Sequence, residues 1–111
     1  MIIGELYLVK SYFWLMFPSL EIVTDNKELL ANISLSYSGA TKYANHYSNR
    51  LNCKINVVSQ NDVFILLKIQ EYKNSTIIKV LSTKGELGWM IISHGSYCFE
   101  LLKDKQTSLL L

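Results

Sequence analysis

The 111-residue sequence predicts a mainly β fold with a minor helix, in the form of a small barrel of about five to seven strands. Two observations lead to this fold class. From residue 53 onward, short apolar segments alternate with a period of two and are separated by turn residues, which is typical of a small closed sheet. Between residues 38 and 52 the apolar residues recur instead along one face of a helix. The length suits a single domain over residues 1–111.

The N-terminal part of the chain predicts strands before a long loop. Residues 2–9 have the pattern of a first strand. The run 12–19, YFWLMFPS, is too apolar for a half-solvated strand, so it is covered on both sides or partly used for binding, and Pro18 ends it. Residues 20–26 predict a short strand that ends in a turn. Residues 27–37 fit a helix or a strand, and we favour a short helix or loop.

Residues 38–52 predict an amphipathic helix. Its apolar face consists of Ala40, Tyr43, Ala44, Tyr47 and Leu51. Ser38 is suited to cap the N-terminal end, and Asn52 to close the C-terminal end. The helix belongs to an insertion in the first long loop of the barrel, over residues 27–52.

The remaining strands are predicted over 53–59, 63–72, 76–82, 87–92 and 96–102. In the strand 63–72, alternation places Val63, Ile65, Leu67 and Ile69 on one face. Gly85 is suited to the positive-φ position of the turn between the two strands of the central hairpin. The tail, residues 104–111, is expected to fray.

The segment from 63 to 102 resembles the second half of an SH3 domain. In that family a strand and a turn lead into a central hairpin, which is followed by Gly, a bulky residue, a short 3₁₀ turn and a closing strand. Gly88-Trp89-Met90 fits the step from Gly to a bulky residue, YCFELL fits the closing strand, and GELYLVK resembles the opening strand. The resemblance covers about half of the chain and implies an SH3-like barrel whose first loop, residues 18–52, is enlarged.

The resemblance does not extend to the peptide-binding platform of proline-binding SH3 domains. Ile77 stands near the position of the platform Trp and Ile91 near that of the Pro, while Tyr97 corresponds to the Tyr. The pattern that includes YFWLMFPS and RLNC also resembles small uncharacterised SH3-like proteins of T4-like marine phages, which implies no activity.

Composition narrows the classes of function. The net charge of +2 is too small to indicate nucleic acid or a membrane surface by itself. Two cysteines, Cys53 and Cys98, allow at most one bridge, and we expect both as reduced core thiols of a cytoplasmic protein. The first ten residues lack a basic n-region and the longest apolar run contains Pro18, so we expect neither a signal peptide nor a membrane span.

Aromatic residues suggest the leading function, which is a non-enzymatic module that binds a protein partner. The candidate aromatic patch consists of Tyr12, Phe13, Trp14, Phe17, Trp89 and Tyr97. A barrel of this size has little room to bury every ring, which favours an exposed groove. The other interpretation is that the rings pack in the core, where aromatic side chains contribute most of the packing energy.

The first alternative function is nucleic-acid binding by Lys42, Tyr43, His46, Tyr47, Arg50 and Lys54. The three basic residues of the helix recur every fourth residue and form one stripe beside two tyrosines. Cations can follow a phosphate backbone while rings stack on bases. The stripe also fits the solvated face of any amphipathic helix.

The second alternative function is a self-associating structural protein that uses the apolar tail or the run around Trp14. No catalytic motif is present, so an enzyme is not expected. Cys53, Cys98, His46 and His94 lack the spacing of zinc ligands, so we expect neither a metal nor another cofactor.

Overall fold

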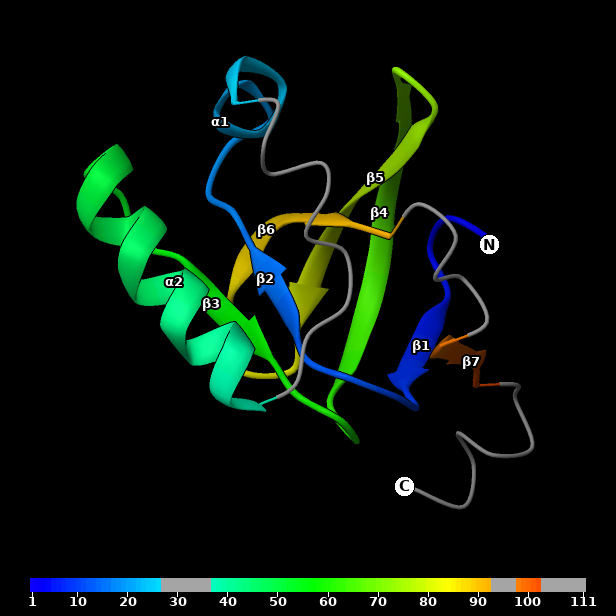
Figure 1. The fold of residues 1–111 in the computed structure, drawn as a ribbon. Coiled ribbons are helices and arrows are strands. Elements are labelled where there is room, and N and C mark those ends of the chain that lie inside the picture. The colour runs from blue at the N-terminus through cyan, green and yellow to red at the C-terminus, as the bar shows by residue number, and fades with distance from the viewer. Residues whose placement is uncertain (27–36, 93–97, 103–111) are drawn as a thin grey trace.

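The computed structural model describes residues 1–26, 37–92 and 98–102. Over these ranges the chain forms seven strands and two helices (Figure 1). The strands are β1 (Leu6–Val9), β2 (Trp14–Met16), β3 (Asn56–Val58), β4 (Val63–Tyr72), β5 (Ser75–Ser82), β6 (Leu87–Ile91) and β7 (Phe99–Leu101), and the helices are α1 (Leu20–Asp25) and α2 (Tyr37–Leu51). The predictions for segment 27–36, for residues 96–97 of the last strand and for the tail 104–111 lie outside the described residues.

The strands form two antiparallel sheets. Five strands pair in the order β6-β5-β4-β1-β7, and β2 pairs with β3. A backbone bridge joins the two sheets, because the Phe17 N–H donates to the Trp89 carbonyl at 2.8 Å and the Trp89 N–H donates to the Phe17 carbonyl at 2.7 Å. The mainly β fold with a minor helical part is therefore confirmed, and both helices lie in the connection between β2 and β3.

The prediction of a closed barrel is wrong. In the described part of the chain no backbone pairing joins β3 to β7, so the curled sheet stays open at this seam. Side chains fill the seam instead, with the rings of Trp14 and Phe99 4.8 Å apart between centroids. Strands of three residues offer few ladder hydrogen bonds, and packing of the two rings replaces them.

Two apolar clusters hold the fold together. The inner core, on the concave side of the curled sheet, consists of Tyr7, Val9, Trp14, Met16, Val58, Phe64, Leu66, Ile78, Val80, Met90, Ile92, Cys98 and Phe99. The helix-side core, on the opposite side, consists of Leu15, Phe17, Val23, Ala40, Ala44, Tyr47, Ile55, Ile77, Trp89 and Ile91. Successive residues of β2 alternate between the clusters, so this short strand is covered on both sides as its composition predicts.

A β-bulge in β4 corrects the predicted faces of this strand. Leu66 pairs with Val80, but the next register position pairs Lys68 with Lys79, so one extra residue is inserted between them. The extra residue reverses the alternation, which places Ile69 against the inner core while Ile65 faces outward. The sequence pattern alone carries no mark of this insertion, because every residue from 63 to 67 is apolar.

The strand predicted over 20–26 is wrong, since these residues form α1. The Ser19 hydroxyl accepts the Ile22 N–H at the N-terminus, and the Asn26 side chain donates to the Ile22 carbonyl at 2.8 Å near the C-terminus. Polar side chains thus satisfy backbone groups that the helix leaves unpaired at both ends.

Helix α2 confirms the predicted amphipathic helix with small differences at its ends. It begins at Tyr37, so Ser38 occupies a position inside the helix and not the position before it. Asn52 follows the helix with a φ of +50°, the left-handed conformation that commonly ends helices. Ala40, Ala44 and Tyr47 are buried against the sheet.

The central hairpin of β5 and β6 confirms the predicted turn and explains Gly88. Gly85 has a φ of +81°, and its N–H donates to the Ser82 carbonyl at 3.0 Å. A Cβ atom at Gly88 would lie 2.8 Å from the Phe17 carbonyl oxygen and would collide with the Met16 side chain. Residue 88 has no room for a side chain because β2 crosses the hairpin here.

Candidate binding surface

The predicted aromatic patch is not an exposed groove. Trp14, Phe17 and Trp89 are 1%, 2% and 8% exposed, so a partner cannot reach their rings without opening the core. Phe13 is half-buried against the helix-side core, and Tyr97 lies outside the described residues. Of the described patch residues, Tyr12 is exposed, at 49%, which leaves one ring where the sequence predicts a surface.

The rings are buried because the two-sided sheet offers each of them a partner. The Trp14 indole packs on Phe99, and its Nε1–H donates to the Ser11 carbonyl at 3.0 Å, which satisfies the polar atom of a buried ring. Trp89 packs in the helix-side core, with the Lys79 ammonium 5.8 Å from the centre of its ring. These aromatic residues therefore stabilise the fold.

The predicted basic stripe lies on the outer face of α2. Lys42, His46 and Arg50 are exposed on this helix, and Lys54 is exposed just after it. Tyr47 is buried, so it is not available to stack on a base, while the Tyr43 ring is 6.1 Å from the Tyr47 ring and remains partly exposed. The basic residues of the stripe are thus exposed as predicted, but one of its two predicted stacking rings is buried.

A surface that the sequence analysis did not identify lies on the convex side of the five-stranded sheet. We call it the outer patch, and it consists of Leu6, Leu8, Val63, Ile65, Leu81 and Leu87. Strand register makes these side chains neighbours, because Leu8 pairs with Val63, Leu6 with Ile65, Ile65 with Leu81, and Leu81 with Leu87. Leu87 is 52% exposed, and the other five side chains are half-buried.

Neither helix covers the outer patch. Helix α2 contacts β2 and β3, and Figure 1 shows it beside these strands while β1 and β7 lie on the other side of the molecule. An antiparallel sheet with one solvated face normally alternates apolar and polar residues. Here the strands are apolar on both faces across the patch, which is the pattern of a face that is covered.

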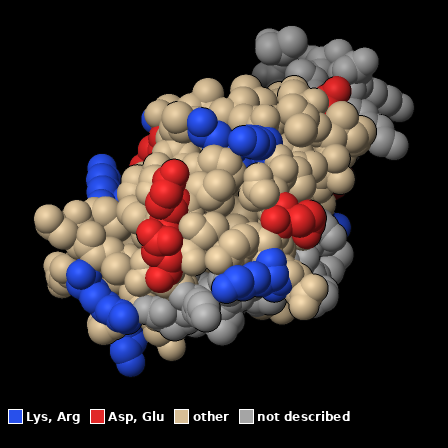
Figure 2. Space-filling model, turned by 90° about the horizontal axis from the view of Figure 1, so that it is seen from above, with Lys and Arg blue, Asp and Glu red and all other residues tan. Residues whose placement is uncertain are grey.

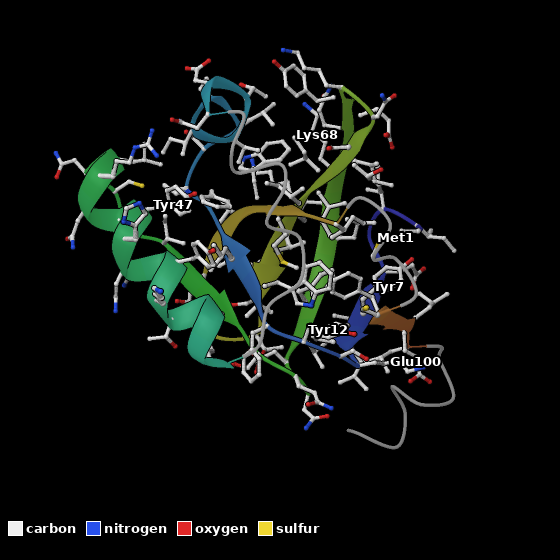
Figure 3. All side chains as sticks on the ribbon, in the orientation of Figure 1. Met1, Tyr7, Tyr12, Tyr47, Lys68 and Glu100 are labelled. Carbon is white, nitrogen blue, oxygen red and sulfur yellow. The ribbon has the colours of Figure 1, made fainter. Side chains whose placement is uncertain are left out.

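The charges beside the outer patch are unevenly placed. Lys68 and Lys79 lie directly opposite each other on β4 and β5, next to Ile65 and Leu81. Glu100 lies on β7 opposite Leu8, at the other end of the patch (Figure 3). Within the described ranges no carboxylate forms an ion pair with either lysine. Like charges opposite each other in a sheet are destabilising, so the lysine pair is an unbalanced positive site.

The remaining molecular surface has no large region of one charge sign on the face that Figure 2 shows. Lys and Arg side chains alternate there with Asp and Glu over a mostly uncharged surface, in agreement with the net charge of +2. In the turn after β5, the Lys84 ammonium lies 3.9 Å from the Asp62 carboxylate, and Lys84 is well exposed to solvent. Such an exposed pair adds little to stability.

The cysteines and histidines of the described residues do not gather into a metal-binding group. Cys53 and Cys98 are both reduced thiols, and burial raises the pKa of the Cys53 thiol, which disfavours the nucleophilic thiolate. The described ranges contain no group of three metal-ligating side chains, and His94 falls outside these ranges. No described helix is long and apolar enough to cross a membrane.

The outer patch had a signal in the sequence, namely that Leu6 and Leu8 share one face of the first strand while Tyr7 and Val9 occupy the other. Both faces of this strand are apolar, which requires cover on both sides. The sequence does not reveal which face the helices cover, because that depends on how β2 and β3 dock. Comparison of the chain with protein-family models, curated proteins and solved structures finds no match.

Proposed function

We propose that the chain is a non-enzymatic binding module that docks a protein partner on the outer patch. The observation that carries this proposal is the register of six aliphatic side chains across β1, β4, β5 and β6, with no described helix over them. Contiguous apolar surface of this kind marks protein contacts, since removing it from water stabilises a complex by roughly 25 cal/mol per Å². The buried rings of the aromatic patch stabilise the sheets that carry the outer patch.

Site-specific photo-cross-linking in the native cell tests this function. A photoreactive amino acid replaces Leu87, the most exposed residue of the outer patch, or Asn45, an exposed residue of α2, in the matched control. We expect a covalent adduct of defined mass from position 87 and none from position 45. Equal labelling at both positions, or no adduct at position 87, contradicts the proposal.

Nucleic-acid binding by α2 is the second candidate function. The observation in its favour is that Lys42, His46 and Arg50 are exposed together on a helix whose sequence contains no acidic residue. Phosphate contacts by Lys42 and Arg50 make affinity fall with salt, with a slope of about −1.4 on logarithmic axes for two contacts to a single strand. Lys42→Glu should then weaken binding of a single-stranded oligonucleotide in a fluorescence anisotropy titration.

The control for nucleic-acid binding is Lys73→Glu, an equal change of charge in the turn between β4 and β5. If both variants weaken binding to the same extent, the contact is a general charge effect and α2 is not the site. The SH3 relationship and the cytoplasmic location also stay proposals, and the two reduced thiols favour a reducing compartment.

A further inference from the structure

We infer that the occupant of the outer patch is a second copy of this chain. This inference rests on the proposed function, because it names the partner of the same surface. Its basis is the arrangement of charge around the patch: an acidic site at one end and a basic site at the other, so that two copies in opposite orientations bring unlike charges together.

The strand registers fix where the charges lie relative to the centre of the patch. The cross-strand pair Leu6–Ile65 occupies the centre. One step along the strands in one direction come Leu8 and its neighbour Glu100, and one step in the other direction comes the lysine pair. A step of two residues along a strand spans about 6.6 Å. The lysine pair lies one such step from Leu81 on β5 and three residues from Ile65 on β4, where the bulge intervenes, so the acidic and basic sites lie on opposite sides of the centre at comparable distances.

A two-fold axis through this centre brings the opposite charges together. In an isologous interface, residue i of one protomer contacts residue j of its partner, and j contacts i. If the axis lies in the plane of the patch between Glu100 and the lysines, the carboxylate of each protomer faces Lys68 and Lys79 of the other copy. Each contact occurs twice, and the aliphatic side chains of both copies pack between the two charged sites.

The dimer also accounts for the lysine pair itself. Within one chain, two ammonium groups directly opposite each other on a sheet repel. Part of this charge lies over the Trp89 ring, and the partner's carboxylate supplies the remaining neutralisation. The same charges set the register of the two sheets, because a shifted register would bring lysines against lysines.

Sedimentation equilibrium of the full chain tests the inference, with circular dichroism to show that each variant is folded. We expect the wild type to form a dimer, and Leu87→Asp and Glu100→Lys each to weaken it at least tenfold. The double charge exchange Glu100→Lys with Lys68→Glu should restore most of the affinity. Lys54→Glu, an equal change of charge at an exposed position after α2, should leave the dimer unchanged.

Each other result overturns the inference. A wild type that stays monomeric up to millimolar concentration shows that the second copy is not the occupant. If the dimer affinity is unchanged in both Leu87→Asp and Glu100→Lys, the dimer forms through another surface. If the double charge exchange does not restore the affinity, Glu100 does not pair with Lys68 of the other copy. In these cases a photo-cross-linked adduct to a different protein would still support the proposed function, so the two can fail separately.

Discussion

Gly88 is the residue at which the fold tolerates least change. The backbone of β2 passes so close that a Cβ atom would lie 2.8 Å from the Phe17 carbonyl and would overlap the Met16 side chain. We expect Gly88→Ala to lower the free energy of unfolding by about 1–3 kcal/mol, the usual cost of overpacking a site that cannot relax. Urea denaturation followed by circular dichroism measures this loss.

The matched control is Gly85→Asn in the hairpin turn. Gly85 has a positive φ but nothing near its Cβ position, and Asn tolerates this conformation. Its cost should stay below about 1 kcal/mol. If both variants lower the free energy of unfolding equally, the loss at position 88 comes from backbone conformation and not from the close contact with β2.

Trp14 tests whether the aromatic segment 12–17 packs in the core or binds a partner. At 1% exposure its indole should fluoresce in the blue range and resist quenching by iodide. The measurement uses Trp89→Phe, in which Trp14 is the remaining tryptophan. Quenching as strong as that of a free indole would show that the Trp14 ring is exposed and would support the hypothesis of an aromatic binding groove.

Cys53 makes the stability of the fold depend on pH in the alkaline range. Burial raises the pKa of its thiol, so the folded chain retains a proton that the unfolded chain has lost. The contribution of this thiol to stability is complete below the unfolded pKa, about 8.5, and is lost as pH rises through the folded value. Stability should therefore fall with rising alkaline pH.

Alkylation of Cys53 by iodoacetamide, followed by mass spectrometry of its peptide, checks this sign. The rate should reach half of its maximum at a higher pH in the folded chain than in urea. An equal or lower midpoint in the folded chain would contradict the desolvation of this thiol.

At the scale of elements, the sequence predicts the strands and turns whose conformation depends on residues close together in the chain. The strand 63–72 and the central hairpin form where expected, because their turns carry residues suited to positive φ, such as Asn74 and Gly85. The sequence pattern does not predict helix α1 because six residues are too few to show a helical period, and caps at Ser19 and Asn26 decide the conformation of this segment.

Helix α2 depends on small side chains to approach the sheet. Ala40 and Ala44 are buried against it, together with Tyr47. Ala44→Glu should lower the free energy of unfolding by about 3 kcal/mol, because it places an unpaired charge in an apolar contact. Asn45→Glu adds the same charge to the exposed face one residue later and should change stability by less than about 0.5 kcal/mol.

Thermal denaturation of both variants measures this difference. Equal stabilities would mean that α2 is not docked on β2 and β3 in solution. In that case the helix would be free to present its buried face to a partner, and the outer patch would no longer be the best-supported surface.

At the scale of the whole molecule, composition and alternation predict a mainly β chain but not how its sheets meet. Closure depends on contacts between β3 and β7, which are more than forty residues apart and three residues long. No local pattern encodes such a contact. The location of the outer patch was unpredictable for the same reason, since it is the part of the convex face that the helices leave uncovered.

The open seam predicts that the molecule unfolds in two parts. A backbone bridge between Phe17 and Trp89 ties the sheet of β2 and β3 to the other five strands, and the contact of Trp14 with Phe99 crosses the seam. Elements with few backbone ties open at a lower free energy than the global unfolding. We expect the sheet of β2 and β3, with α2 on it, to open first.

Native-state hydrogen exchange at low denaturant measures this order. The amides of β2 and β3 should exchange by an opening that exposes less surface and costs less free energy than the opening of β5, which has a hydrogen-bonded strand on each side. Equal protection and equal denaturant dependence in both sheets would show one cooperative unit. The outer patch lies wholly on the five-stranded sheet, so a partner bound there would raise protection of β4 and β5 and leave the early opening of β2 and β3 unchanged.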